Sequence, residues 1–139
     1  GWLPTPDEQA SAFLAEMSAA PFPDPGHWVQ IGIAEPDSQR LIGDIGVFLD
    51  FDAASAEIGF TLARSAQGRG VATVAVRRVV DLIFQCSAAE RVMGITDARN
   101  LPSMRLMERV GMRRTETRQT VFRGDACVEH TYIVTRAGT

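Results

Sequence analysis

A glycine-containing segment lies between a predicted strand and a predicted helix, and its residue types suit the binding of an anion. Its members are Gln67, Gly68, Arg69, Gly70, Val71 and Ala72. Glycines let the backbone turn tightly and bring its N–H groups close to a ligand, because no Cβ intervenes. The first N–H groups of the following helix lack partners within the helix and add a positive dipole end. The segment therefore suits a pyrophosphate, although a tight strand–helix turn that binds nothing has the same composition.

Two other kinds of phosphate loop are excluded by the same residues. The segment has no Gly-Lys-Ser/Thr ending, which a nucleotide P-loop requires. It has no full G-x-G-x-x-G, and the strand before it is not the first of a doubly wound unit, so a dinucleotide fingerprint is excluded too.

The pattern Gln67-x-x-Gly70-x-Ala72 matches the Q/R-x-x-G-x-G/A signature of the GNAT acetyltransferases. In that family the signature cradles the pyrophosphate of coenzyme A. A second pattern begins at Asn100-x-x-Ser103 and resembles the family's N-x-x-[AS]…L-x-E-K-x-G-F helix. Its later members are Leu106, Glu108, Val110, Gly111 and Met112.

A third segment, residues 56–60 (AEIGF), resembles the fourth strand of the same family. The resemblance covers residues 28–134 and is nearest to the RimJ/RimL-type branch, whose members acetylate protein N-termini or small amines. It implies acetyl-CoA as the acyl donor and no metal.

Acetylation of a primary amine needs a base, because the amine is protonated near neutral pH. Glu57 is the best candidate, since its position matches a strand on which several GNAT members place their base; a solvated strand glutamate is the alternative. Asp44, Asp50 and Asp52 are weaker candidates, and the last two have the character of turn residues.

The resemblance also assigns the groups that would contact the acyl donor. Backbone N–H groups near Phe60, Thr61 and Leu62 would stabilise the thioester oxyanion, and this stretch would pair with the pantetheine arm like an added strand. Asn100 would bind pantetheine or a site water, or serve only as a helix N-cap. Ser103 would help the thiolate leave, or only pack within its helix.

One position departs from the family. Met107 stands where many members carry a tyrosine that protonates the leaving thiolate, and a thioether has no proton to give. Tyr132 and His130 are fallback proton carriers, and both are also ordinary residues of a predicted hairpin.

The elements that must position these groups follow from periodicity and turn residues. A helix is expected over residues 6–19, a loop over 20–26 and a turn over 35–38. Strands are expected at 28–33, 41–49, 55–62 and 91–96, a hairpin at 115–122 and 126–134, and helices at 71–86 and after the cap at Asn100. The strand–loop–helix–strand unit resembles a βαβ crossover whose two strands need not be fully paired. Trp28 is expected in the core.

The fold class is therefore α/β (α+β): a single GNAT-like domain over 1–139, with a mixed, mostly antiparallel sheet flanked by helices. Residues 1–26 form an N-terminal helix and loop, and 27–134 form the core. Family members begin with a strand and helix that have no counterpart here, which would leave a sheet edge open and favour a homodimer.

The composition of the chain indicates which classes of binding partner to expect. The 139 residues carry a formal net charge of −3, which argues against nucleic acid as the main partner. No apolar run approaches the length that spans a bilayer, so no membrane is expected. Two cysteines in unlike contexts suggest no disulfide framework and a cytoplasmic location.

Two functions remain open. The first is an N-acetyltransferase that moves an acetyl group from acetyl-CoA to a protein N-terminus or small amine by direct attack. The second is a non-catalytic acyl-CoA-binding regulatory domain.

Overall fold

Seven strands form one mixed sheet in the order β1-β2-β3-β4-β5-β7-β6. The computed structural model describes residues 13–16, 25–34, 40–52, 54–63 and 70–136. The strands are β1 Phe13–Glu16, β2 Trp28–Ala34, β3 Leu41–Leu49, β4 Ser55–Leu62, β5 Arg91–Asp97, β6 Arg113–Phe122 and β7 Asp125–Thr135. All neighbouring strands are antiparallel except β4 and β5, which are parallel and are connected through a helix.

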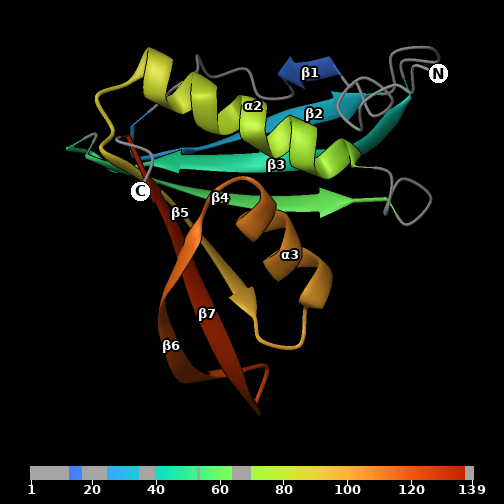
Figure 1. Ribbon diagram of the computed structural model, residues 1–139, viewed down its shortest axis with the longest axis vertical. Helices are drawn as coiled ribbons and strands as arrows, with labels where there is room; N and C mark the ends of the chain where they lie inside the picture. Colours follow the sequence, from blue (N-terminus) through green and yellow to red (C-terminus); the bar gives the residue numbers. More distant parts are fainter. Residues whose placement is uncertain (1–12, 17–24, 35–39, 53, 64–69, 137–139) are drawn as a thin grey trace, which may run out of the picture.

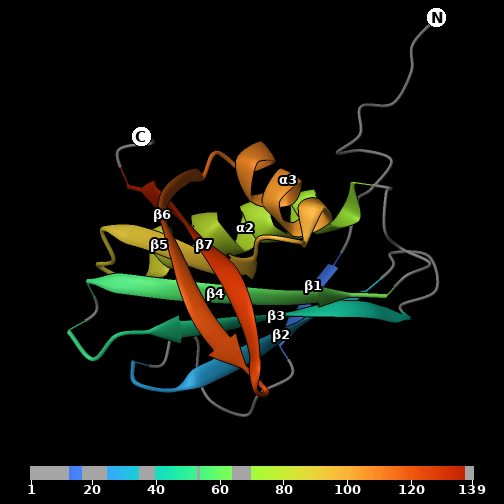
Figure 2. The ribbon, with the colours of Figure 1, turned by 90° about the horizontal axis from the view of Figure 1, so that it is seen from below.

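Two helices, α2 (Val71–Cys86) and α3 (Leu101–Arg109), cover the same face of the sheet, as Figure 2 shows. The core lies between this face and the helices. It contains alternate residues of the strands, such as Ile45 and Ile58, and the inward side of α2. A polar stripe runs along the outer side of α2, with Arg77, Asp81 and Gln85 exposed. The mixed sheet with flanking helices is thereby confirmed.

The predicted helix over residues 6–19 is wrong at residues 13–16. These residues form β1, which pairs antiparallel with the end of β2 in the register Phe13↔Ala34 to Glu16↔Ile31. Pairing with β2, the next strand along the chain, has overridden the local helical spacing. The rest of that segment, and the turn expected at 35–38, lie outside the described residues. β1 lies beside β2 and is itself an edge strand of the described sheet, so the homodimer stays a prediction.

The C-terminal end of α2 is held by the guanidinium of Arg136, which follows β7. This group donates hydrogen bonds to the carbonyls of Phe84 (2.7 Å), Ser87 (2.9 Å) and Ala89 (2.7 Å). It also lies 5.1 Å from the centre of the Phe84 ring. A cation placed on the last carbonyls of a helix satisfies their free lone pairs and the negative end of the dipole.

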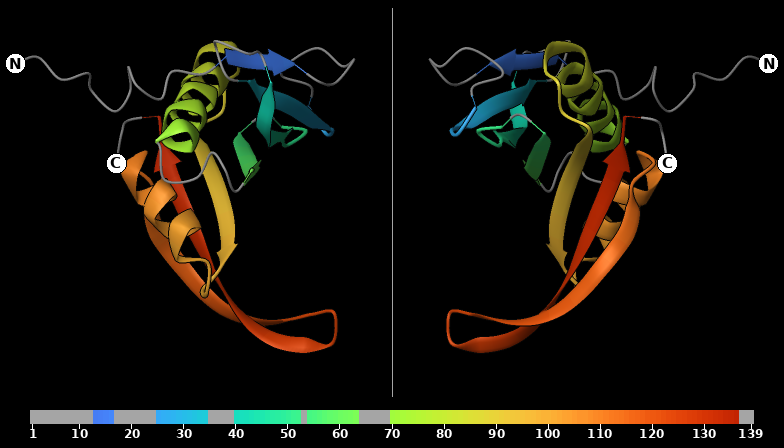
Figure 3. Two further views of the ribbon diagram at one scale, coloured as in Figure 1. Left: turned by 90° about the vertical axis from the view of Figure 1, so that its right-hand side faces the viewer. Right: turned by 90° about the vertical axis from the view of Figure 1, so that its left-hand side faces the viewer.

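The hairpin of β6 and β7 turns at Arg123 and Gly124, which both have positive φ (55° and 83°). Two consecutive residues in this region are typical of a tight two-residue hairpin turn. Figure 3 shows the hairpin extending beyond the layer of helices, so that its tip is remote from α2.

Candidate functional site

β4 and β5 separate partway along their length. Their pairing runs from Ser55↔Arg91 to Ile58↔Gly94 and ends there, although β4 continues to Leu62 and β5 to Asp97. Figure 1 shows the two strands diverging from this point. Along residues 59–62, alternate backbone N–H and C=O groups therefore face the gap instead of a neighbouring strand. The sequence left open whether these strands pair along their full length, and the structure shows that they pair only in part.

The N-terminus of α2 presents backbone groups and no capping side chain. Gly70 holds a left-handed conformation (φ 77°, ψ 0°) and makes no side-chain cap, and the first turn of α2 contains no acidic residue. Val71 and Ala72 bury their side chains in the core, so the helix start is fixed. The N–H groups of this first turn have no partner within the helix. Gln67, Gly68 and Arg69, the other members of the predicted anion loop, lie outside the described residues.

α3 begins just after the end of β5, and Asn100 is its N-cap. The Asn100 side-chain oxygen accepts a hydrogen bond from the Ser103 N–H at 3.2 Å. Ser103 is buried, 8% exposed, on the inward side of α3. In the structure Asn100 therefore serves as a helix N-cap and Ser103 packs within its helix, which were the alternatives to ligand binding. Their contacts with a ligand remain predictions.

The turn between β5 and α3 is fixed by Asp97 and Arg99. Both carboxylate oxygens of Asp97 accept hydrogen bonds from the Arg99 guanidinium at 2.9 Å, and one of them also accepts from the Arg99 backbone N–H. These bonds lower the pKa of Asp97 to about 2. Asp97 is therefore ionised at neutral pH and is committed to the turn.

Glu57 lies on the sheet face opposite the helices, next to the last β4 residue that pairs with β5. In register it stands beside Phe48 on β3 and Met93 on β5. Partial burial raises the pKa of its carboxyl group, and the carboxylates of Asp50 and Glu129 raise it further. A raised pKa makes a carboxylate a better proton acceptor near neutral pH.

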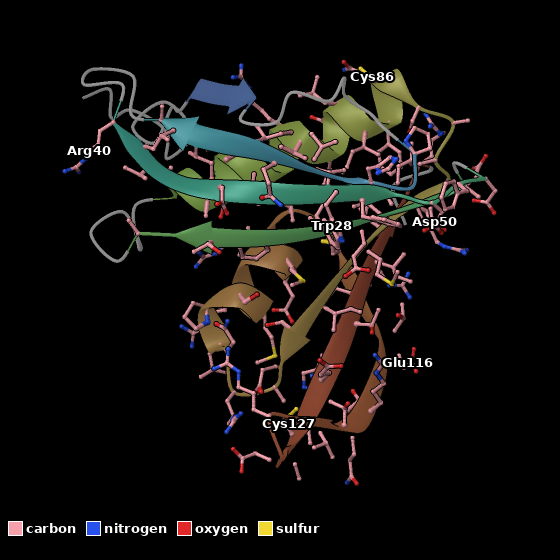
Figure 4. All side chains as sticks on the ribbon, turned by 180° about the vertical axis from the view of Figure 1, so that it is seen from behind. Trp28, Arg40, Asp50, Cys86, Glu116 and Cys127 are labelled. Carbon is pink, nitrogen blue, oxygen red and sulfur yellow. The ribbon has the colours of Figure 1, made fainter. Side chains whose placement is uncertain are left out.

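The weaker carboxylate candidates differ in position. Asp44 lies on the same sheet face as Glu57, opposite Thr61 on β4. Asp50 is exposed just after the end of β3, and Figure 4 shows it at the opposite end of the sheet from Arg40. Asp52 accepts a hydrogen bond from the Ala54 N–H at 2.9 Å, which is the turn role expected for it.

The fallback proton carriers are both engaged elsewhere. Tyr132 is 1% exposed, and its hydroxyl donates to the Glu108 carboxylate at 3.3 Å. Burial and the Glu108 charge both raise the pKa of Tyr132. His130 lies between the Thr117 hydroxyl (2.8 Å) and the Arg114 guanidinium (3.0 Å). Because arginine can only donate, His130 Nε2 is the acceptor, and it has no lone pair left for an amine proton.

Met107 is buried under α3 against β5. A Cβ placed on Gly94 would lie 3.0 Å from its sulfur. This close approach explains why position 94 is a glycine. The Met107 thioether stands where many family members carry a tyrosine hydroxyl.

A hollow of about 360 Å³ that the sequence analysis missed lies on the face opposite the helices. It is lined by Trp28, Gln30, Asp44, Gly46, Gly59, Phe60 and Thr61. Trp28 was expected in the core and is 49% exposed. The signal was present in β2, where Trp28 and Gln30 alternate with the buried Val29 and Ile31. That alternation places the indole on the outer face (Figure 4).

In the described part of the chain, no three His, Cys, Asp or Glu side chains are grouped as metal ligands would be. Neither of the described helices is long and apolar enough to cross a bilayer.

Comparison with known proteins agrees with these features. The model of the acetyltransferase (GNAT) domain family matches residues 1–113. The Bacillus subtilis protein named "Probable N-acetyltransferase YjcK" is 38% identical over 82 residues, which are 58% of this chain and 45% of that protein. The match thus spans about half the length of this curated relative.

Solved structures share the fold. Mycobacterium smegmatis RimJ, in complex with CoA-disulfide, has a TM-score of 0.73 at 22% identity, covering 81% of this chain and 55% of that one. An F149A mutant of the Vibrio cholerae spermidine N-acetyltransferase SpeG has a TM-score of 0.72 at 16% identity, covering 81% and 68%. With most of its length matched by the family model, the chain belongs to the GNAT acetyltransferase domain family.

Proposed function

We propose that this chain is an N-acetyltransferase that moves an acetyl group from acetyl-CoA to a primary amine. The observation that carries the proposal is the divergence of β4 from β5 after Ile58↔Gly94. The helix α2, which packs on this sheet, begins at a left-handed glycine with no capping side chain. A strand edge with free backbone groups and a helix N-terminus with free N–H groups are what an extended, phosphorylated ligand needs.

The chain's own groups fit the donor in three parts. The N–H groups at Gly70 and the first turn of α2 would hold the pyrophosphate, together with Gln67, Gly68 and Arg69. The free edge of β4 at Phe60, Thr61 and Leu62 would pair with the amide groups of the pantetheine arm. One N–H of this edge would also donate to the thioester oxygen as it gains charge.

Glu57 would take the proton of the acceptor. The ammonium group gives one proton to the Glu57 carboxylate, directly or through a water, and the freed amine nitrogen attacks the thioester carbon. The carbon–sulfur bond then breaks, the nitrogen gives up its extra proton to form the amide, and coenzyme A leaves as a thiolate that takes up one proton, directly or through a water. Ser103 is the predicted group at the thiolate and Asn100 at the pantetheine arm.

The acceptor is a protein N-terminus or a small amine. The RimJ/RimL-type branch supports both, since the structural likenesses include RimJ and a spermidine N-acetyltransferase. The half-buried Glu57, beside the carboxylates of Asp50 and Glu129, favours a cationic acceptor of either kind.

The donor site can be tested by replacing Gly70 with valine. A Cβ at this left-handed position would strain the backbone and stand before the helix N–H groups. Acetyl-CoA at a hundredfold excess over its dissociation constant should stabilise the parent by about 2.7 kcal/mol, and Gly70→Val should abolish the shift in unfolding temperature.

The matched control is Gly124→Val, which introduces the same strain at a positive φ (83°) in the remote hairpin turn. That variant should lose stability and keep the full shift with acetyl-CoA. If Gly70→Val keeps the shift, the assignment of the loop is wrong.

A second function, binding of acyl-CoA without turnover, is favoured by one observation. Met107 leaves α3 without a proton donor at the position where many family members have one. Release of free thiol from acetyl-CoA in the presence of amines distinguishes the two functions: a thermal shift without amine-dependent thiol release would select the binding domain.

A further inference from the structure

The hollow on the outer sheet face lies over three rows of registered residues, of which Phe48, Glu57 and Gly32 are not among its lining residues. The first row is Trp28, Phe48 and Glu57, the second is Gln30, Gly46 and Gly59, and the third is Gly32, Asp44 and Thr61. Each row crosses β2, β3 and β4 in order. Residues in register point to the same face, so the middle row is a floor with almost no side chains between two rows that carry carboxylates.

Two glycines, Gly46 and Gly59, shape this floor. A Cβ on Gly46 would lie 3.1 Å from the Gln30 amide nitrogen and 3.3 Å from the Trp28 ring. Both side chains therefore lie over β3 in the space that Gly46 leaves. A Cβ on its partner Gly59 would meet nothing within 4 Å, so the β4 side of the floor is free.

The lining of the hollow suits a positively charged group. Trp28 packs against Phe48 with ring centres 5.4 Å apart and is 49% exposed, so part of the indole is available to a ligand. Asp44 adds a carboxylate and Gln30 an amide oxygen. An ammonium is attracted by an aromatic face and by a carboxylate, and no lysine or arginine is among the described residues that line the hollow.

The hollow adjoins the gap at which acetyl transfer would occur. Gly59, Phe60 and Thr61 line the hollow and also belong to the part of β4 that has left β5. Glu57 and Asp44 stand two rows apart on neighbouring strands, which separates their Cα atoms by about 14 Å. A ligand that forms an ion pair with both carboxylates at once therefore needs two cationic groups joined by a linker.

We propose that this hollow binds a second cationic group of the acceptor, so that the preferred substrates are primary amines with another ammonium on an alkyl linker. This inference rests on the proposed acetyl transfer. One ammonium lies between Trp28 and Asp44 and keeps its proton. The other reaches the gap beside Glu57, loses its proton there and is acetylated. An amine whose far end is neutral leaves Asp44 unpaired, and one whose far end is a carboxylate is repelled.

The kinetic test compares three acceptors of equal length: 1,6-diaminohexane, hexylamine and 6-aminohexanoate. The parent should acetylate the diamine with a KM about tenfold or more below that of hexylamine, the effect of one charge-assisted contact. Asp44→Asn should remove this advantage by raising KM for the diamine with little change in kcat. Trp28→Leu should raise the same KM about 2- to 30-fold.

The matched control is Asp81→Asn, which removes an exposed carboxylate from α2 on the opposite side of the sheet. Asp81→Asn should leave both KM values at the parental level. Equal KM values for diamine and hexylamine in the parent, or an unchanged diamine KM in Asp44→Asn, would overturn the subsite and leave acetyl transfer standing.

Binding without acetyl-CoA separates the failure of the subsite from the failure of the proposed activity. Titration with 1,6-diaminohexane should change the tryptophan fluorescence of the parent, and Trp28→Leu should lose the change. If no amine is acetylated and the response is present, the activity is wrong and the subsite stands. If the parent gives no response at diamine concentrations well above the KM, or up to the solubility limit where no turnover exists, the subsite is wrong.

Discussion

Glu57 combines a strand position predicted from the sequence with an environment that only the structure reveals. Its pKa is raised first by partial burial, and then by the carboxylates of Asp50, across the turn between β3 and β4, and of Glu129 on β7, which is distant in sequence. Whether a residue on a predicted strand is half-buried among like charges depends on tertiary neighbours. For that reason the sequence could nominate Glu57 and could not show why it would serve as a base.

Glu57→Gln should lower turnover by about 10²–10⁴-fold, the usual contribution of a positioned general base. Affinity for acetyl-CoA should be unchanged, because the proposed donor contacts are backbone groups elsewhere. The parental rate should fall as the pH drops through the raised pKa of Glu57, since the carboxyl is then protonated, and the variant should lack this limb. Rates measured from pH 5 to 9 check the expectation; parental activity throughout would remove Glu57 from the mechanism.

One control and one stability measurement accompany this variant. Asp50→Asn removes one of the charges that raise the pKa of Glu57, so the acidic limb should move to lower pH. The raised pKa also means that folding favours the neutral form of Glu57. That stabilisation is present below the unfolded pKa and is lost as the pH rises through the folded pKa. Glu57→Gln should therefore unfold at a higher temperature than the parent at pH 7, with the gain absent at pH 4.

At the scale of elements, the contact of α3 with β5 depends on the absence of one methyl group. Gly94→Ala would place a Cβ 3.0 Å from the Met107 sulfur and 3.2 Å from its methyl carbon. Because Met107 is buried, its displacement should cost about 1–3 kcal/mol of the free energy of unfolding. Urea denaturation measures the change.

Gly59→Ala is the matched control for Gly94→Ala, since both glycines lie in strands and a Cβ on Gly59 meets nothing within 4 Å. Its free energy of unfolding should stay within about 0.5 kcal/mol of the parent. Equal losses in the two variants would contradict the packing argument.

The hydrogen bonds between Arg136 and the C-terminal end of α2 lead to a separate prediction. Arg136→Met keeps the apolar stem and removes the hydrogen bonds to three carbonyl groups. Because the bonds are charge-assisted and partly exposed, we expect a loss of about 1–2 kcal/mol in the free energy of unfolding. Arg118→Met is the comparison: its ion pair with Glu129 spans 3.4 Å on the surface and should contribute less than about 0.5 kcal/mol. A loss in Arg136→Met no larger than in Arg118→Met would show that the hydrogen bonds of Arg136 do not contribute measurably to the free energy of unfolding.

At the scale of the whole molecule, the sequence was a good guide where local pattern and tertiary environment agree. The bounds of β3, β4 and α2 are as predicted, because their apolar periodicity faces one core and turn or cap residues end them. The prediction failed at residues 13–16, where helical spacing gave way to pairing with β2. It also missed the hollow, because three strands must be in register before Trp28, Gly46 and Asp44 lie together.

The short parallel joint between β4 and β5 has a consequence for folding. Four of the other five described strand pairs join neighbours in sequence. The pairs β4–β5 and β5–β7 do not: Ser55 lies 36 residues before Arg91, and Arg91 lies 44 residues before Thr135. Each of these two pairings closes a loop that contains a helix, so both are expected to form after the contacts between sequence neighbours. The gap is therefore the place where one of the late-formed strand pairings stops. Natural selection on substrate binding and on successful folding would act there on the same few residues.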